Sequence, residues 1–320
     1  MPILDFSRPL FALAPLAGFT DLPFRSVVKQ FGADLTVSEM ISSNALAFQN
    51  ERTIRMLETS PLESPYSIQI AGSDPTVIRK AVDLINEQTG VDIIDLNCGC
   101  PAPKVVNNLQ GSSLLTDLKK MGETIRTIKD HSNKPYTSVK IRIGFDEKKP
   151  VEIAKVCEDN GADFIAVHGR TRSGRYKAPV DYDAIKAIKA AVSIPVIANG
   201  DITTPQKAQW VLDYTGADGI MVGRGAVGKP WIFQIMKAYI NGVGSSEVTP
   251  ELIKAVVLEH FDQMINHYGK YGTVMFRKHL HTYSKTGYQG ASAFRDLVNR
   301  VDDPAEMRGI IEEFFGQPLL

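Results

Sequence analysis

A cysteine just beyond an apolar run is the residue of this chain best placed to do chemistry. Cys100 follows segment 91–94, which predicts a buried strand, and Gly99 and Pro101 bend the backbone on either side of it. The polar segment 102–113 then predicts a mobile loop that carries Cys100 over a pocket. A thiol placed there is a nucleophile if a base lies nearby, a general acid if it is protonated over a reacting carbon, or inert.

Other polar side chains lie at the ends of further apolar runs. Gln69, Lys140 and His168 each close or follow such a run. An amide offers a heterocycle both a donor and an acceptor, and a buried lysine can hold negative charge on a ring carbonyl or a reduced cofactor. Residues 169–172 add a basic segment that can contact phosphate. The alternative for His168 is a hydrogen-bonded core histidine.

Two glycine-containing turns, 199–201 and 223–225, follow the last two apolar runs. Glycines let backbone N–H groups approach phosphate oxygens, a following helix N-terminus adds positive potential, and Arg224 supplies a forked cation. The pair of turns therefore predicts a phosphate site. Two tight turns without a ligand are the alternative.

Eight short apolar runs recur along the chain, and a helix-like stretch follows each of them. The runs are Leu10–Ala14, Leu35–Val37, Tyr66–Ile70, Ile93–Leu96, Thr137–Ile141, Phe164–Val167, Val196–Ala198 and Gly219–Val222. This pattern predicts an α/β fold, a (β/α)8 TIM barrel whose chemistry lies where the strands end. A doubly wound sheet is the rival, but residues 14–18 lack the G-x-G-x-x-G fingerprint that its first turn needs.

The pattern of residues changes towards the C-terminus. Residues 242–246 predict a linker, and Pro250 predicts the first turn of a helix. We therefore expect a barrel that carries the catalytic site over residues 1–242. A small all-helical domain is expected over residues 243–320.

The composition is that of an ordinary globular protein. Of 320 residues, 43% are hydrophobic and 22% are charged, and 36 basic residues balance 36 acidic ones. The net charge therefore does not indicate a nucleic acid partner, which would need a local basic patch.

The cysteine content argues for a reducing environment. Cys98, Cys100 and Cys157 make a poor disulfide framework, so we expect a cytoplasmic location. Their spacing gives no zinc site without a second Cys/His cluster, and we expect no metal. We expect neither a membrane span nor a signal peptide, because the apolar runs are short and the N-terminus lacks a basic region followed by an apolar one.

These residues resemble the tRNA-dihydrouridine synthase family, most closely its bacterial B-type branch. The matching stretches are 14–18 with Thr20 and Asp21, Gln69, 97–101 with Lys104, Val105, Gly111 and Ser112, Lys140 with Arg142, 168–171, 199–201 and 223–225. The resemblance covers the barrel and continues into the helical domain. The joint presence of the motif around Cys100 and of His-Gly-Arg-Thr is highly specific.

The resemblance implies an FMN enzyme that reduces the uracil C5=C6 bond of specific uridines in tRNA, with NADPH as the reductant. It implies a hydride from flavin N5 to C6, a proton from Cys100 to C5, and Asn97 against the flavin or the uracil. The residues that it implies hold FMN are Pro15, Leu16, Ala17, Gln69, Lys140, His168, Asn199, Gly200, Asp201, Gly223 and Arg224. Lys140 would there stabilise negative charge near flavin N1.

The helical domain resembles the tRNA-contacting part of the family. Arg277, Lys278 and His279 match its motif, but the family often continues with Gly-Trp-Tyr where this chain has 281–283, which keeps only Tyr283 as an aromatic contact. Between 270 and 300 the basic residues are Lys270, Arg277, Lys278, Lys285, Arg295 and Arg300, and the acid is Asp296. A basic face on a neutral protein fits a phosphate backbone. We therefore expect tRNA as the partner of a monomer.

Two other functions compete with this interpretation. The barrel could bind FMN and reduce a free pyrimidine, in the manner of dihydroorotate dehydrogenases, but the basic face argues against it. The chain could instead be an RNA-binding or RNA-folding protein with a catalytically idle barrel. Flavin absorbance in the purified protein would discriminate between these two.

Overall fold

A closed barrel of eight parallel strands forms the larger part of the molecule. The computed structural model describes residues 3–244, 247–285 and 287–319. Within them the barrel strands are β1 (Leu10–Leu13), β2 (Leu35–Val37), β4 (Tyr66–Ala71), β5 (Ile93–Cys98), β6 (Tyr136–Arg142), β7 (Phe164–His168), β8 (Val196–Asn199) and β9 (Gly219–Val222). The pairings β1–β9 and β2–β4 complete the ring. The predicted TIM barrel is confirmed.

One short strand was not predicted. β3 (Ile41–Ser42) pairs with the end of β4 at Ile70 and Ala71, outside the ring of eight. Two residues are too few to give a periodic signal in the sequence.

Alternate side chains of each strand enter two different cores. In β1, Leu10 and Ala12 pack with other strand side chains inside the barrel, whereas Phe11 and Leu13 pack with side chains of the surrounding helices, such as Phe24. Both faces of the strands are therefore buried, which explains why they occur as continuous apolar runs in the sequence.

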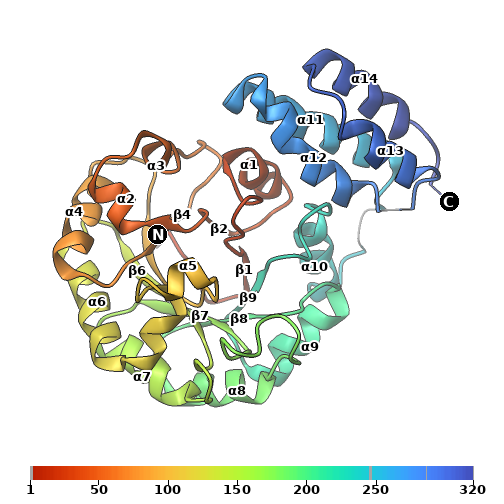
Figure 1. Cartoon of the computed structure of the whole chain (residues 1–320). Coiled ribbons are helices and arrows are strands. Elements are labelled where there is room, and N and C mark those ends of the chain that lie inside the picture. Colours follow the sequence, from red (N-terminus) through yellow and green to blue (C-terminus); the bar gives the residue numbers. More distant parts are fainter. Residues whose placement is uncertain (1–2, 245–246, 286, 320) are drawn as a thin grey trace.

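A ring of helices covers the outside of the barrel (Figure 1). The helices are α1 (Leu22–Gln30), α2 (Ser43–Ala47), α3 (Glu51–Arg55), α4 (Pro75–Asn86), α6 (Leu118–His131), α7 (Pro150–Asp159), α8 (Tyr182–Ala191), α9 (Pro205–Thr215) and α10 (Ile232–Ile240). The short helix α5 (Pro103–Val106) lies inside this ring in Figure 1, and a 3-10 turn at 111–116 follows it. Their starts follow local chemistry. The side chains of Asp74 and Thr204 cap α4 and α9, and a proline follows each cap.

Four further helices form a separate group beside the barrel, next to α1 and α10 in Figure 1. They are α11 (Pro250–Tyr268), α12 (Tyr271–Tyr283), α13 (Ala291–Val298) and α14 (Pro304–Phe314). Phe261, Phe276 and Ile311 lie in a core of their own, which Val27 of α1 and Trp231 also enter. The helical group is therefore joined to the barrel by apolar packing. No helix of the described chain is long and apolar enough to cross a membrane.

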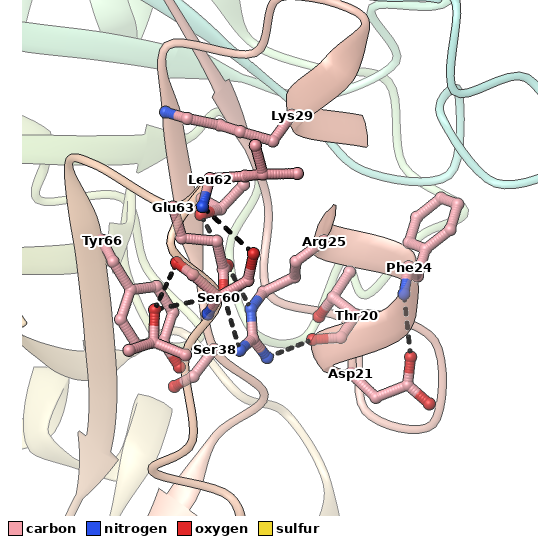
Figure 2. A network of polar contacts seen from close by, with 12 residues as sticks. Thr20, Asp21, Phe24, Arg25, Lys29, Ser38, Ser60, Leu62, Glu63 and Tyr66 are labelled. Atoms are coloured by element: carbon pink, nitrogen blue, oxygen red, sulfur yellow. Dashed lines mark hydrogen bonds and ion pairs between the residues drawn. The ribbon is translucent and has the colours of Figure 1, made fainter. Parts of the chain in front are cut away.

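A buried ion pair fixes α1 against the loop that precedes β4 (Figure 2). Arg25 Nε lies 2.6 Å from Glu63 Oε1, and both side chains are almost fully buried. Nη1 of Arg25 donates to the carbonyl oxygen of Thr20, and Nη2 donates to the carbonyl oxygen of Glu58 and to Glu63 Oε2. The hydroxyl of Thr36 donates to the same carboxylate. These additional hydrogen bonds allow two charges to stay away from water.

Candidate active site

The C-terminal ends of the strands surround a cavity of about 470 Å³. A volume of this size is typical of small-molecule and cofactor sites. The predicted site residues that line it are Pro15, Leu16, Ala17, Gln69, Asn97, Cys100, Lys140, His168, Asn199, Gly200, Asp201, Gly223 and Arg224. Parallel strands that end at one rim bring together side chains far apart in the sequence.

A chain of buried amides leads to the cysteine loop. Gln69 donates from Nε2 to Asp95 Oδ2 over 2.7 Å, and Asn97 donates from Nδ2 to Gln69 Oε1 over 2.7 Å. Asn97 Oδ1 then accepts the backbone N–H groups of Gly99 at 3.1 Å and Cys100 at 2.9 Å. The amide of Asn97 therefore shapes the turn that presents the thiol.

A second contact holds the cysteine loop from the other side. The carbonyl oxygen of Cys100 accepts hydrogen bonds from the backbone N–H of Ser112 at 3.2 Å and from its hydroxyl at 2.8 Å. Gly111 before it has φ +61°, and a Cβ there would lie 2.8 Å from Val105 Cγ1. Cys100 is partly exposed at the cavity, whereas Cys98 is buried in the core. Only the first of these two thiols is open to a ligand.

Lys140 supplies a half-buried cation in the cavity wall. Its Nζ donates to Asn199 Oδ1 over 2.9 Å, and Asn199 donates from Nδ2 to the carbonyl oxygen of Met221 over 2.7 Å. Burial, and secondly Arg142, lower the pKa of Lys140 to about 8. The side chain therefore still carries a proton at neutral pH and can stabilise an anion.

His168 lies among several cations and is uncharged. Burial, followed by the charges of Lys140, Arg142, Arg170 and Arg224, lowers its pKa far below the neutral range. Its Nε2 lies 3.3 Å from a guanidinium nitrogen of Arg170. The neutral ring accepts that hydrogen bond, which leaves its Nδ1 as the donor.

Two arginines meet one carboxylate at the corner predicted to bind phosphate. Asp201 accepts from Arg224 at 3.0 Å and from both terminal nitrogens of Arg170. The hydrogen bond with Arg170 lowers the pKa of Asp201, so the carboxylate is ionised. An anion does not bind phosphate directly. Asp201 instead orients the two guanidinium groups at the rim.

Gly200 has a conformation that few other residues adopt. Its φ is +133°, and a Cβ there would lie 2.9 Å from Val180 and 3.2 Å from the ring of His168. The glycine lets the backbone pass close to His168 at the predicted phosphate corner.

The cavity also contains residues that the sequence did not identify as site residues. Tyr176 is half-exposed, and its ring lies 5.5 Å from the guanidinium carbon of Arg142 and 5.0 Å from that of Arg224. Met40 also lines the cavity. Asp95 is fully buried behind Gln69, and burial raises its pKa to about 6. An aromatic residue in the basic loop 170–177 was a usable signal for Tyr176.

The residues predicted to contact a substrate in the helical domain lie away from this cavity. Lys278 lines a groove of about 1110 Å³ between the barrel and the helical domain, and Arg277 pairs with Asp302 beside it. His279 and Tyr283 are both 0% exposed. In this arrangement neither buried side chain offers surface to an RNA, because both pack between helices.

Comparison with known proteins identifies the family of this chain. The family described as "Dihydrouridine synthase (Dus)" matches residues 12–317. The chain is 50% identical over 319 residues to the "Probable tRNA-dihydrouridine synthase" of Helicobacter pylori strain J99, covering 99% of this chain and 95% of that protein. It is 41% identical over 307 residues to the "tRNA-dihydrouridine synthase B" of Vibrio vulnificus, covering 95% and 94%.

Similarity to solved structures supports the fold. The crystal structure of TcOYE with pHBA is 8% identical with a TM-score of 0.54, and covers 82% of this chain and 94% of that one. At this identity the likeness shows the barrel architecture alone. The match to the family, in contrast, extends over the barrel and the helical domain alike. The chain therefore belongs to the dihydrouridine synthase family.

Proposed function

We propose that this chain reduces uridines in tRNA to dihydrouridine, with FMN bound in the barrel mouth and NADPH as the reductant. The observation that carries the proposal is the convergence of Cys100, Lys140 and the Arg170–Arg224 pair on one cavity. The thiol can supply a proton, and the half-buried cation of Lys140 can stabilise an anionic ring. The arginines at the corner can attract a phosphate.

The residues of the cavity fit FMN. Arg224, held by Asp201 and exposed at the rim, offers its guanidinium to the phosphate, together with the glycine turn at Gly200 and the positive charge of the buried Arg170 behind them. Lys140, on β6 and bonded to Asn199 of β8, would hold the ring of the flavin. FMN bound there would supply the hydride for C6 of the uracil, and NADPH would reduce the flavin again.

Cys100 holds the proton that the reaction needs at C5. Hydrogen bonds to Asn97 and Ser112 fix the backbone of Cys100, so its thiol is held in position. Hydride addition leaves negative charge on the uracil, and the thiol proton neutralises it at carbon. A nucleophilic role would need a base beside the sulfur. The described residues give Cys100 no hydrogen bond to a histidine or a carboxylate.

The substrate reaches this site from the groove. Ala17 lines both the cavity and the groove that contains Lys278, so the two openings are adjacent. A stacked base must leave the tRNA to enter the mouth. Basic side chains of the groove, such as Arg52, Arg55 and Lys278, can hold the phosphates outside. We infer that the enzyme acts on tRNA in the cytoplasm as a monomer.

The Cys100→Ala variant tests the proposal. It is expected to bind FMN as the unchanged enzyme does and to lose about 10²- to 10⁴-fold in dihydrouridine formation on tRNA. Cys157→Ala is the matched control, because that thiol is buried in the core, and it should keep its activity. Full activity of Cys100→Ala would refute the acid role, and absence of flavin from the unchanged protein would refute the cofactor.

A further inference from the structure

We propose that Asp21, His260 and His279 bind one divalent metal ion, zinc by the chemistry of the ligands, at the junction of the barrel and the helical domain. One ligand atom from each residue lies within 4.8 Å of the other two. Two imidazoles and a carboxylate form a three-residue set that zinc accepts, with a fourth position open. This proposal does not depend on the flavin or on tRNA.

The three ligands come from different parts of the fold. Asp21 is the N-cap of α1, on the barrel side, whereas His260 lies in α11 and His279 lies in α12. A bound ion would therefore connect the barrel to both of the helices that pack against it. Distances of this kind are invisible in the sequence, since the ligands belong to no common motif.

Unpaired imidazole nitrogens are the second observation that points to a ligand. Both ring nitrogens of His279, and Nε2 of His260, are buried without a hydrogen-bond partner among the described residues. Both rings are 0% exposed. Buried polar atoms are nearly always paired, so three unpaired nitrogens in one place need an explanation. A metal ion that takes a lone pair from each ring accounts for two of them and leaves the second nitrogen of His279 as an N–H.

Neighbouring hydroxyl groups already hold two of the ligands. His260 Nδ1 lies 3.1 Å from the hydroxyl of Tyr283, which leaves Nε2 as the free nitrogen. The Asp21 carboxylate accepts from the backbone N–H of Phe24 and from the hydroxyl of Tyr268, both at 3.3 Å. Figure 2 shows the bond from Phe24 to Asp21 at the start of α1. Contacts of this kind commonly orient metal ligands.

The protonation states suit a cation. Burial lowers the pKa of both histidines, so each ring is neutral and keeps a lone pair. Burial, and secondly Glu39, raise the pKa of Asp21 to about 6, which leaves its carboxylate largely ionised at neutral pH. The positive charges of Lys278 and Arg25 also act on Asp21 and oppose a metal ion, while Glu39 favours one.

The ligand atoms have to move closer when an ion binds. Zinc bonds to nitrogen and oxygen of about 2.0–2.2 Å place neighbouring ligand atoms roughly 3.3 Å apart. His279 can approach by rotation without breaking a side-chain hydrogen bond, because neither of its ring nitrogens has a partner among the described residues. Its ring lies among other rings, with Phe19 at 5.4 Å and Phe276 at 5.7 Å between centroids. A trapped water molecule is the alternative occupant.

Metal content tests the site directly. Tag-free full-length enzyme, incubated with zinc chloride and gel-filtered, is expected to retain about one zinc per chain by mass spectrometry. His279→Ala and Asp21→Asn should retain at least about tenfold less at matched protein concentration. His281→Ala is the control, because this histidine lies on the same helix with its ring against Asn299. Zinc-free unchanged enzyme, or a zinc content that His279→Ala leaves unaltered, would overturn the proposal.

A second measurement avoids variants that fold poorly. Crystals of the unchanged enzyme soaked in zinc chloride should show an anomalous peak at the zinc edge between the three side chains. A water molecule only, without an anomalous signal at that position, would overturn the assignment. A chelator should also lower the melting temperature of the zinc-loaded enzyme, and an unchanged temperature would contradict a junction held by the ion.

Discussion

Lys140 and Asn199 are joined across the barrel mouth by a hydrogen bond of 2.9 Å from Nζ to Oδ1. They belong to β6 and β8, so the bond spans the intervening strand β7 that ends in His168. The amide fixes the position of the ammonium group before any ligand arrives. A cation held in place in this way stabilises an anion without first having to reorganise.

Removal of the Lys140 charge should make the bound flavin harder to reduce. Lys140→Met deletes the half-buried cation assigned to the flavin ring in our proposal, so the midpoint potential should fall by roughly 30–60 mV, about 1.4–2.8 kcal/mol for a two-electron couple. Lys189→Met is the control, because Lys189 pairs with Asp218 at the opposite end of the barrel. Spectroscopic redox titration measures both. An unchanged midpoint potential in Lys140→Met would show that Lys140 does not stabilise the reduced flavin.

Lys278 should contribute one phosphate contact in the groove. The variant Lys278→Ala is expected to weaken tRNA binding similarly for different tRNA sequences and to reduce the slope of log K against log salt by about 1. Lys119→Ala provides the comparison, since Lys119 is exposed on α6, on the outside of the barrel. Fluorescence titration at several salt concentrations distinguishes them. Equal slopes in both variants would place the RNA elsewhere.

The buried pair of Arg25 and Glu63 should matter to stability. Glu63→Gln leaves the Arg25 charge buried without its partner, and the free energy of unfolding should drop by about 3–5 kcal/mol. Asp262→Asn breaks the half-exposed pair with Arg308 and should cost no more than about 1 kcal/mol. Urea denaturation followed by circular dichroism measures both values. Similar losses would mean that burial does not strengthen the first pair.

Asp95 should give the unfolding free energy a measurable pH dependence. The pKa of Asp95 is about 6 in the folded chain, against an ordinary value of 3.8. Between pH 3.8 and about 6 the folded state therefore binds more protons than the unfolded state does. The stability that this proton provides is complete below pH 3.8 and is lost as the pH rises through about 6. Asp95→Asn removes the effect, so its unfolding free energy relative to the unchanged protein should rise by roughly 2–3 kcal/mol from pH 4 to 7. Parallel pH profiles of the unfolding free energy for the two proteins would contradict the raised pKa of Asp95.

The sequence predicted the barrel and most of its mouth for a physical reason. Strands buried on both faces occur as apolar runs, and the residue that ends each run must lie at the same rim as the others. Gln69, Lys140, His168 and Asn199 could be assigned on that basis, before any distance was known. The β3 strand was missed because two residues carry no period.

The positions of loop and helix side chains were harder to predict. Tyr176 reaches the cavity from the loop after β7, and a single sequence does not indicate that path. Arg170, in contrast, belongs to the basic segment that the sequence predicted to contact phosphate. The spacing of Phe276, His279 and Tyr283 places all three on one face of α12, and this face is buried. The spacing was therefore a signal in the sequence that His279 and Tyr283 are buried. The motif resemblance directed attention to RNA instead of to this apolar face.

Reoxidation of the reduced enzyme by tRNA tests the central claim most directly. Protein reduced with NADPH under anaerobic conditions is mixed with tRNA that lacks dihydrouridine, and the visible flavin band is followed with time. The account predicts that the band returns and that dihydrouridine appears in an amount equal to the flavin reoxidised. A band that stays bleached in the presence of this tRNA, or that recovers equally fast with free uridine, would contradict it.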